Sequence, residues 1–196
     1  SRVGLALGTS ASTIAISEAA YARGHFEAPQ DHEALNTLHG VTHFVQQRLG
    51  LQGPALTVST ACSSSAKVFA VAERWLRLKL VDAVVVAGVD ALSNSLLYGF
   101  NALGLLSNAP CRPFDAERKG ISLGEAAGFA LLQRIDDAPS ALRLRGWGEA
   151  NDAHHMSSPH PEGLGAERAL TDALARAGVQ AHRIDYINLH GTASAR

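Results

Sequence analysis

The chain of 196 residues is 46% hydrophobic and 18% charged, with a formal net charge of -1. This composition is typical of one soluble globular domain, or a large piece of one, and it excludes an intrinsically disordered protein. The near-neutral charge, without any run of like charges, excludes the basic field with which nucleic-acid binders neutralise phosphates.

The cysteine content and the length of the apolar runs indicate the cellular compartment of the protein and whether it spans a membrane. Its cysteines, Cys62 and Cys111, follow no cationic and hydrophobic leader, and we expect free thiols, as in a reducing cytoplasm. A transmembrane helix needs about 20 apolar residues, and the richest stretch, 82–92, is shorter. We therefore expect a cytoplasmic protein that does not span a membrane. Because strand-like runs lie at both ends of the sequence, we also expect truncation at each end.

The first sixty residues predict two strands separated by helices. The apolar run 3–7 leads into Gly8 and is typical of a strand that enters a tight turn. Apolar positions at helical spacing predict a helix over 32–49, which Gly50 would end in a left-handed conformation. Residues 55–59 then predict a short strand.

The motif TACSSS at 60–65 opens a second long helix, with polar residues at its N-terminus. After it, residues 82–88 (DAVVVAG) form an apolar, β-branched run, the pattern of a strand that helices cover on both faces. The alternation of strands and helices predicts an α/β fold. The helix side chains expected to face the core are Val68, Val71, Ala72, Trp75, Leu76 and the stem of Lys79.

The second half of the chain predicts strands at 128–133 and 142–147, joined by a polar connector at 136–140 that is the candidate domain boundary. A helix is expected over 167–177 and a strand over 184–189. The side chains expected to face inward from this helix are Leu170, Ala173, Leu174 and Ala177, and Gly178 is its expected stop.

Cys62 follows one predicted strand and precedes a helix. Ligands of open α/β sheets bind at the C-terminal ends of the strands. The N–H groups and dipole of a helix N-terminus stabilise a thiolate, and the small neighbours of Cys62 leave room for a thioester. Its own backbone N–H can donate to a tetrahedral oxyanion. The alternative is a buried structural cysteine.

His190 also follows a predicted strand and precedes Gly191. A ring nitrogen in this position can donate a hydrogen bond to a carbonyl or enolate oxygen, and glycine keeps the approach open. The alternative is a histidine that caps the strand with a backbone hydrogen bond.

The segment 151–161 (NDAHHMSSPHP) gathers an acid and three histidines. A metal site is one interpretation, but no ligand pair has i, i+4 spacing, and the prolines favour an extended loop that lines a substrate site. We therefore expect no metal.

Two other motifs favour structural roles. Arg112 and Asp115 are expected to pair in a turn. Gly120, Gly124 and Gly128 are interpreted as close-packing positions, because no phosphate-binding glycine motif is present.

Five stretches together resemble the β-ketoacyl synthase family of thiolase-like enzymes, in the order in which that family has them. The resemblance implies a layered α/β/α/β/α fold, here incomplete. Residues 1–140 would be the latter part of an N-terminal half with the nucleophilic cysteine, and 141–196 the start of a C-terminal half with the first catalytic histidine. The stretches are 53–65 with TACSSS, DAVVVAGVDA (82–91), CRPFDAERKGISLGEAAG (111–128), NDAHHMSSPHPEG (151–163) and NLHGTAS (188–194).

The resemblance also implies a reaction, a decarboxylating Claisen condensation in fatty-acid or polyketide synthesis. Cys62 corresponds to the nucleophile that takes an acyl group from the phosphopantetheine arm of an acyl carrier protein. His190 corresponds to the first of two histidines that stabilise the enolate of the malonyl substrate. The resemblance further implies that Thr192 and Ser194 hydrogen-bond the pantetheine arm and that Asp152, His155 and Ser157 line the tunnel.

The implied partners are an acyl carrier protein and a second copy in a homodimer, with no cofactor beyond the carrier's phosphopantetheine. The family's second histidine, a lysine and a glycine-phenylalanine loop would follow Arg196, so we expect the chain alone to be inactive. One alternative is a thiolase acting on acyl-coenzyme A, against which the His-Gly-Thr motif speaks. Another is a non-catalytic chain-length partner subunit, against which the retained Cys62 speaks.

Overall fold

The computed structural model describes residues 2–24, 37–135, 142–155 and 158–194. The chain divides into two compact units. The first comprises Ser1–Arg134 and Thr192–Ala195, and the second comprises Ile135–Gly191 and Arg196.

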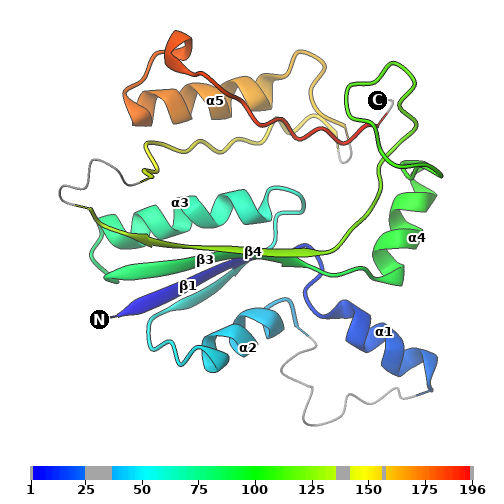
Figure 1. The fold of residues 1–196 in the computed structure, drawn as a ribbon, viewed down its shortest axis with the longest axis horizontal. Coiled ribbons are helices and arrows are strands. Elements are labelled where there is room, and N and C mark those ends of the chain that lie inside the picture. Colours follow the sequence, from blue (N-terminus) through cyan, green and yellow to red (C-terminus); the bar gives the residue numbers. More distant parts are fainter. Residues whose placement is uncertain (1, 25–36, 136–141, 156–157, 195–196) are drawn as a thin grey trace. The chain divides into compact units, whose positions relative to one another are not determined.

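A four-stranded sheet forms the centre of the first unit (Figure 1). Its strands are β1 (Val3–Gly8), β2 (Ala55–Val58), β3 (Ala83–Asp90) and β4 (Ala126–Gln133), in the order β2-β1-β3-β4. β1 is parallel to both β2 and β3, whereas β4 is antiparallel to β3. The C-terminal ends of the three parallel strands therefore meet at one edge, next to the start of β4.

Helices lie on both faces of this sheet, as Figure 1 shows for α3 (Ser64–Arg77) and α2 (Gly40–Arg48). α3 is the crossover connection that two parallel strands require, and it runs from β2 to β3. The α/β prediction is thereby confirmed, and so are most of the core positions expected on α3. The buried core consists of Ala6, Val58, Val68, Val71, Ala72, Leu76, Val81, Val84 and Val86, with Phe69, Trp75, Ala130 and Leu132 packed against it.

Two shorter helices, α1 (Ile14–Ala22) and α4 (Asn94–Ala102), are tied together by one carboxylate. Glu18 accepts hydrogen bonds from the backbone N–H groups of Asn94, at 2.8 Å, and Ser95, at 2.6 Å. A helix N-terminus has unsatisfied N–H groups, and an acid there is stabilised in its charged form. The side-chain and backbone hydrogen bonds from Ser95 accordingly lower the pKa of Glu18.

The second unit contains α5 (Leu164–Ala177) and the 3-10 turn η2 (Ala181–Arg183). α5 ends at Gly178 in the left-handed conformation, with φ of 61°, as expected. Gly146 and Gly148 allow the extended segment before α5 to approach its backbone, because a Cβ at either position would collide with that helix.

Several expected boundaries in the chain are wrong. The helix expected over 32–49 begins at Gly40 within the described residues, and 32–36 lie outside them. Its expected end is confirmed, because Gly50 follows it in a left-handed conformation with φ of 62°. Residues 142–147 and 184–189 are not strands, because neither segment takes part in a hydrogen-bonded ladder. α5 starts three residues before the expected position, and Leu170, expected to face inward, is 59% exposed.

Candidate functional site

Cys62 lies in the tight turn between β2 and α3, one residue before the helix N-cap Ser63, and is exposed. The preceding residue, Ala61, has a left-handed backbone with φ of 53°. The buried Ser64 hydroxyl holds this turn, since it donates to the Ala61 carbonyl at 2.6 Å and accepts from the Thr60 N–H at 2.8 Å. The expected position of Cys62, after a strand and at a helix N-terminus, is confirmed.

Two glycines allow the first turn of α3 to approach the sheet closely. Gly8 and Gly88 are paired in neighbouring strands at the C-terminal ends of β1 and β3. A Cβ at Gly8 would lie 2.6 Å from the Ser65 nitrogen, and one at Gly88 would lie 2.6 Å from the Ser65 Cβ. Real Cβ atoms do not approach other atoms so closely. The absence of a Cβ at Gly8 and Gly88 therefore allows Cys62, just before α3, to lie close to the strand ends.

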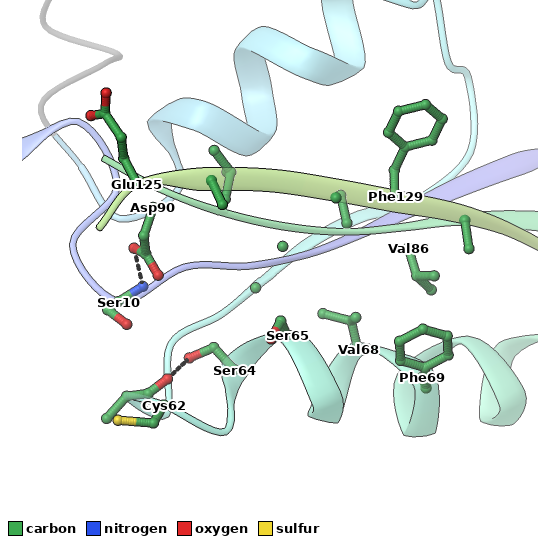
Figure 2. Close-up of a pocket in the computed structure, with 18 of the residues that line it drawn as sticks. Ser10, Cys62, Ser64, Ser65, Val68, Phe69, Val86, Asp90, Glu125 and Phe129 are labelled. Atoms are coloured by element: carbon green, nitrogen blue, oxygen red, sulfur yellow. Dashed lines mark hydrogen bonds between the residues drawn. The ribbon is translucent and has the colours of Figure 1, made fainter. Parts of the chain in front are cut away.

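Asp90 binds the chain segment after β1 to the end of β3. Its Oδ1 accepts hydrogen bonds from the Ser10 N–H at 2.7 Å, the Ala11 N–H at 3.3 Å and the Thr9 hydroxyl at 3.0 Å. Figure 2 shows the Ser10 bond on the same side of the sheet as Cys62. The Thr9 side chain is fully buried, and its hydroxyl oxygen in turn accepts from the Ser12 N–H at 2.9 Å. These hydrogen bonds hold the segment after β1 against the end of β3, and together they form the wall of the site opposite Cys62.

A pocket of about 610 Å³ extends from Cys62 between α3 and the sheet (Figure 2). Val68, Phe69 and Val86 make part of its wall apolar, and Asp90 and Glu125 line it near the strand ends. The Glu125 carboxylate points away from Cys62 (Figure 2). Glu125 comes directly before β4 and accepts a hydrogen bond from the Leu92 N–H at 3.2 Å. An exposed thiol beside a partly apolar pocket has the arrangement needed to hold an acyl chain as a thioester.

Thr192 and Ser194 belong to the first unit, where they form a turn around the buried Ala193. Their hydroxyl oxygens lie 3.0 Å apart. Gly120 donates its N–H to the Ala193 carbonyl at 3.0 Å, and Arg118 donates from Nε to the Ser194 carbonyl at 2.9 Å. The structure therefore brings these two predicted residues together.

The other predicted site residues belong to the second unit. Asp152 accepts at Oδ2 from the His160 N–H at 2.8 Å, and this hydrogen bond is the main cause of the lowered pKa of its carboxyl group. His155 and His190 are exposed, and Ser157 lies outside the described residues. Among the described residues, no three metal-binding side chains gather in one place.

The structural roles predicted for the Arg112–Asp115 pair and for three glycines are confirmed in part. Arg112 and Asp115 form the expected ion pair at 3.5 Å. Gly120 is a close-packing position, with φ of 131° and the Leu106 carbonyl carbon 3.0 Å from where a Cβ would lie. The same interpretation is wrong for Gly124 and Gly128, because both have open space where a Cβ would lie.

Sequence reasoning missed Gly8, Gly88, Asp90 and Glu125 as site residues. The signal for Asp90 was present, because it is the first acidic residue after the apolar run of β3. Ligands bind at the C-terminal ends of parallel strands, and this rule holds for Asp90 as it does for Cys62 and His190.

The chain matches two family models. Residues 1–138 match the model described as "Beta-ketoacyl synthase, N-terminal domain", and residues 142–196 match "Beta-ketoacyl synthase, C-terminal domain". Within the part of the chain that the structure describes, no helix has the length and apolar character needed to cross a membrane.

Curated relatives are similar over most of the chain. The 3-oxoacyl-[acyl-carrier-protein] synthase 2 of Rhizobium meliloti (strain 1021) is 37% identical over 163 residues, which cover 76% of this chain and 39% of that protein. Nodulation protein E of Rhizobium meliloti is 37% identical over 154 residues, covering 76% of this chain and 38% of that protein. The chain thus spans about two fifths of the length of these relatives.

Solved structures share the fold. A ketosynthase (ApeO) in complex with its chain length factor (ApeC) from Xenorhabdus doucetiae has a TM-score of 0.90 at 39% identity, covering 99% of this chain and 49% of that one. A β-ketoacyl synthase from Burkholderia phymatum STM815 has a TM-score of 0.84 at 25% identity, covering 100% of this chain and 51% of that one.

Proposed function

Because the chain belongs to the β-ketoacyl synthase family, we propose that the protein acts as a β-ketoacyl-[acyl-carrier-protein] synthase. It condenses an acyl thioester with a malonyl group on an acyl carrier protein, in fatty-acid or polyketide synthesis. The observation that carries this proposal is the exposed Cys62 at the N-terminus of α3, beside a pocket of about 610 Å³.

In the first step, the Cys62 thiolate attacks the carbonyl carbon of an acyl group on the carrier's phosphopantetheine arm. The backbone N–H of Cys62 donates to the tetrahedral oxyanion. The bond between the carbonyl carbon and the pantetheine sulfur then breaks. The carrier leaves as a thiol, and the acyl chain, now on Cys62, extends along the apolar wall formed in part by Val68 and Phe69.

In the second step, malonyl-carrier protein loses carbon dioxide. The electron pair of the broken carbon–carbon bond moves into an enolate, and a ring N–H of His190 donates to the enolate oxygen. The α-carbon then attacks the thioester carbonyl on Cys62, a new carbon–carbon bond forms, and the Cys62 thiolate is released. Thr192 and Ser194 hydrogen-bond the pantetheine arm, and Asp152, His155 and Ser157 belong to the loop that lines the tunnel.

The proposal extends to organisation and partners. Residues 1–140 form the latter part of the nucleophile-bearing half, and 141–196 form the start of the half with the first catalytic histidine. The acyl carrier protein is the donor, a second copy of the chain completes a homodimer, and the protein works in the cytoplasm.

The first experiment measures the intact mass of the protein before and after incubation with acyl-carrier protein, followed by peptide mapping. We expect one acyl group on Cys62 and none in Cys62→Ser. Cys111→Ser is the matched control, because Cys111 is also exposed but does not line the pocket, and it should acylate normally. Acylation that persists in Cys62→Ser would refute the mechanism, and acylation of Cys62 would exclude a non-catalytic partner subunit.

A second variant separates the two steps. His190→Ala should still accept an acyl group on Cys62 but should lose decarboxylation of malonyl-carrier protein, measured as released carbon dioxide. Normal decarboxylation in this variant would remove the role assigned to His190.

A further inference from the structure

The turn at Thr192–Ser194 holds one residue in an unfavourable conformation, although the Ser194 N–H donates to the Thr192 hydroxyl oxygen at 3.4 Å within the turn. Ala193 has a left-handed backbone with φ of 60° and is only 4% exposed. This conformation is unfavourable for a residue with a Cβ. Such strain persists where the surrounding structure imposes it, so the contacts that impose it here are part of the site's construction.

Two of these contacts come from the loop that precedes β4. The N–H of Gly120 donates to the Ala193 carbonyl at 3.0 Å, and Arg118 donates from Nε to the Ser194 carbonyl at 2.9 Å, across 76 residues of sequence. Arg118 also donates from Nη1 to the Asp115 carbonyl at 3.1 Å. Because the guanidinium group is planar and rigid, these two bonds fix the Ser194 carbonyl relative to the loop.

The loop that carries Arg118 is itself held by internal hydrogen bonds and an ion pair. Asp115 accepts from the Glu117 N–H at 2.7 Å, and it pairs with Arg112 at 3.5 Å. Arg112 donates to the Glu117 carbonyl at 3.3 Å. The hydrogen bond and the ion pair of Arg112 thus lie within the loop, whereas Arg118 reaches from the loop to the turn.

We propose that Arg118 is a positioning residue that holds the Thr192–Ser194 turn in the one conformation in which both hydroxyls face the pantetheine arm. The pantetheine role of those hydroxyls rests on the proposed function. In the held turn, the Thr192 and Ser194 hydroxyls are hydrogen-bonded to each other at 3.0 Å, so that together they can bind one amide or carbonyl group. Without Arg118, Ala193 relaxes toward a right-handed or extended backbone and the two hydroxyls separate.

The test compares Arg118→Gln and Arg118→Lys with two controls in the same loop. Arg112→Gln removes an arginine that contacts Glu117 and Asp115 within the loop, and Lys119→Gln removes the positive charge next to Arg118. For each variant, the rate of Cys62 acylation is measured against acyl-carrier-protein concentration, giving a KM and a maximal rate. Alkylation of Cys62 by iodoacetamide, which carries no pantetheine, reports whether the thiol itself is unchanged.

We expect Arg118→Gln to raise the KM for acyl-carrier protein by about tenfold, the usual effect of losing one charge-assisted hydrogen bond. The alkylation rate and the maximal rate should stay within about twofold of wild type, and Arg118→Lys should recover part of the loss. An unchanged KM would overturn the proposal, and so would an equal rise in Lys119→Gln, because both would assign the effect to something other than the turn.

Amide hydrogen exchange separates this proposal from the proposed function. Gly120, whose N–H bonds the turn, should exchange faster in Arg118→Gln than in Arg112→Gln. If the wild-type protein accepts no acyl group on Cys62, the proposed function fails, and unchanged exchange at Gly120 would then refute the positioning role as well.

Discussion

The two units of the chain differ in what covers their apolar side chains. In the first unit, α3 and the sheet enclose residues such as Leu5, Val84 and Val86 almost completely. In the described part of the second unit no side chain is buried, and Leu142 is fully exposed. A helix makes its backbone hydrogen bonds within its own segment, as α5 does, whereas a strand and a core need a partner surface. The predictions below test this difference, from the largest expected effect to the smallest.

Truncation of one leucine in each unit should have very different costs. Leu5→Ala removes a fully buried side chain, and we expect the free energy of unfolding to fall by about 2–5 kcal/mol. Leu142→Ala removes a fully exposed one and should change it by less than about 0.5 kcal/mol. Urea denaturation of the 196-residue chain gives both values. Similar losses in the two variants would mean that the second unit has a core of its own.

Two glycine substitutions within the first unit should have opposite signs. Gly88→Ala places a Cβ 2.6 Å from the Ser65 Cβ, and we expect a loss of about 1–3 kcal/mol together with slower alkylation of Cys62. Gly99→Ala, in the middle of α4 with open space around it, should stabilise the protein by about 0.5–1 kcal/mol. Thermal unfolding and iodoacetamide kinetics measure both effects, and a neutral Gly88→Ala would contradict the close approach of α3.

Asp90→Asn should weaken the wall opposite Cys62 without unfolding the protein. The amide oxygen can still accept hydrogen bonds, but the bonds to Thr9, Ser10 and Ala11 lose their charge, so we expect a loss of about 1 kcal/mol. Glu125→Gln is the control, since within the described ranges that carboxylate accepts one hydrogen bond, from the Leu92 N–H, and its cost should be smaller. Chemical denaturation of both variants measures the loss in the free energy of unfolding. Equal losses would contradict the role assigned to the Asp90 hydrogen bonds.

The smallest expected effect is a loss of stability at acidic pH, and it should appear in both units. Hydrogen bonds with Ser95 lower the pKa of Glu18, and a hydrogen bond from the His160 N–H lowers the pKa of Asp152. A carboxyl group whose pKa is lowered by folding adds stability above its unfolded pKa. That contribution is lost as the pH falls through the folded pKa, below ordinary values of 4.5 for glutamate and 3.8 for aspartate.

Amide exchange of Ser95 and His160 at pH 6 and pH 3 measures this loss at each site. Both amides should lose protection in acid, after correction for intrinsic exchange rates. In Glu18→Gln and Asp152→Asn the side-chain oxygen still accepts but does not titrate, so the protection of the corresponding amide should be weaker than in the wild type at pH 6 and should not change between the two pH values. Protection that is independent of pH in the wild-type protein would contradict the assigned hydrogen bonds.

The sequence predicted those parts of the fold that depend on local pattern. The apolar run of β3, the stripe of α3 and the glycine stops at Gly50 and Gly178 could all be recognised without a partner segment. The start of α2 could not, because Leu38 continues the helical spacing although the helix begins at Gly40. The strands expected at 142–147 and 184–189 also failed, since an extended run becomes a strand only beside another strand.

The site divides in the same way. Cys62 could be predicted because its turn and its helix are adjacent in sequence. Asp90 and the glycine pair Gly8 and Gly88 were missed because their roles arise from strand register, which brings together residues about 80 positions apart. The bond from Arg118 to Ser194 spans 76 residues and left no local signal either.

This division sets the order in which the site can assemble as the chain leaves the ribosome. The turn around Cys62 is held by Ser64 through contacts three and four residues away, so it is complete once α3 has emerged. The opposite wall needs Asp90, and contacts between distant residues form late because a long loop must close first. A nascent chain that ends between α3 and β3 therefore carries its cysteine at a helix terminus with no pocket beside it.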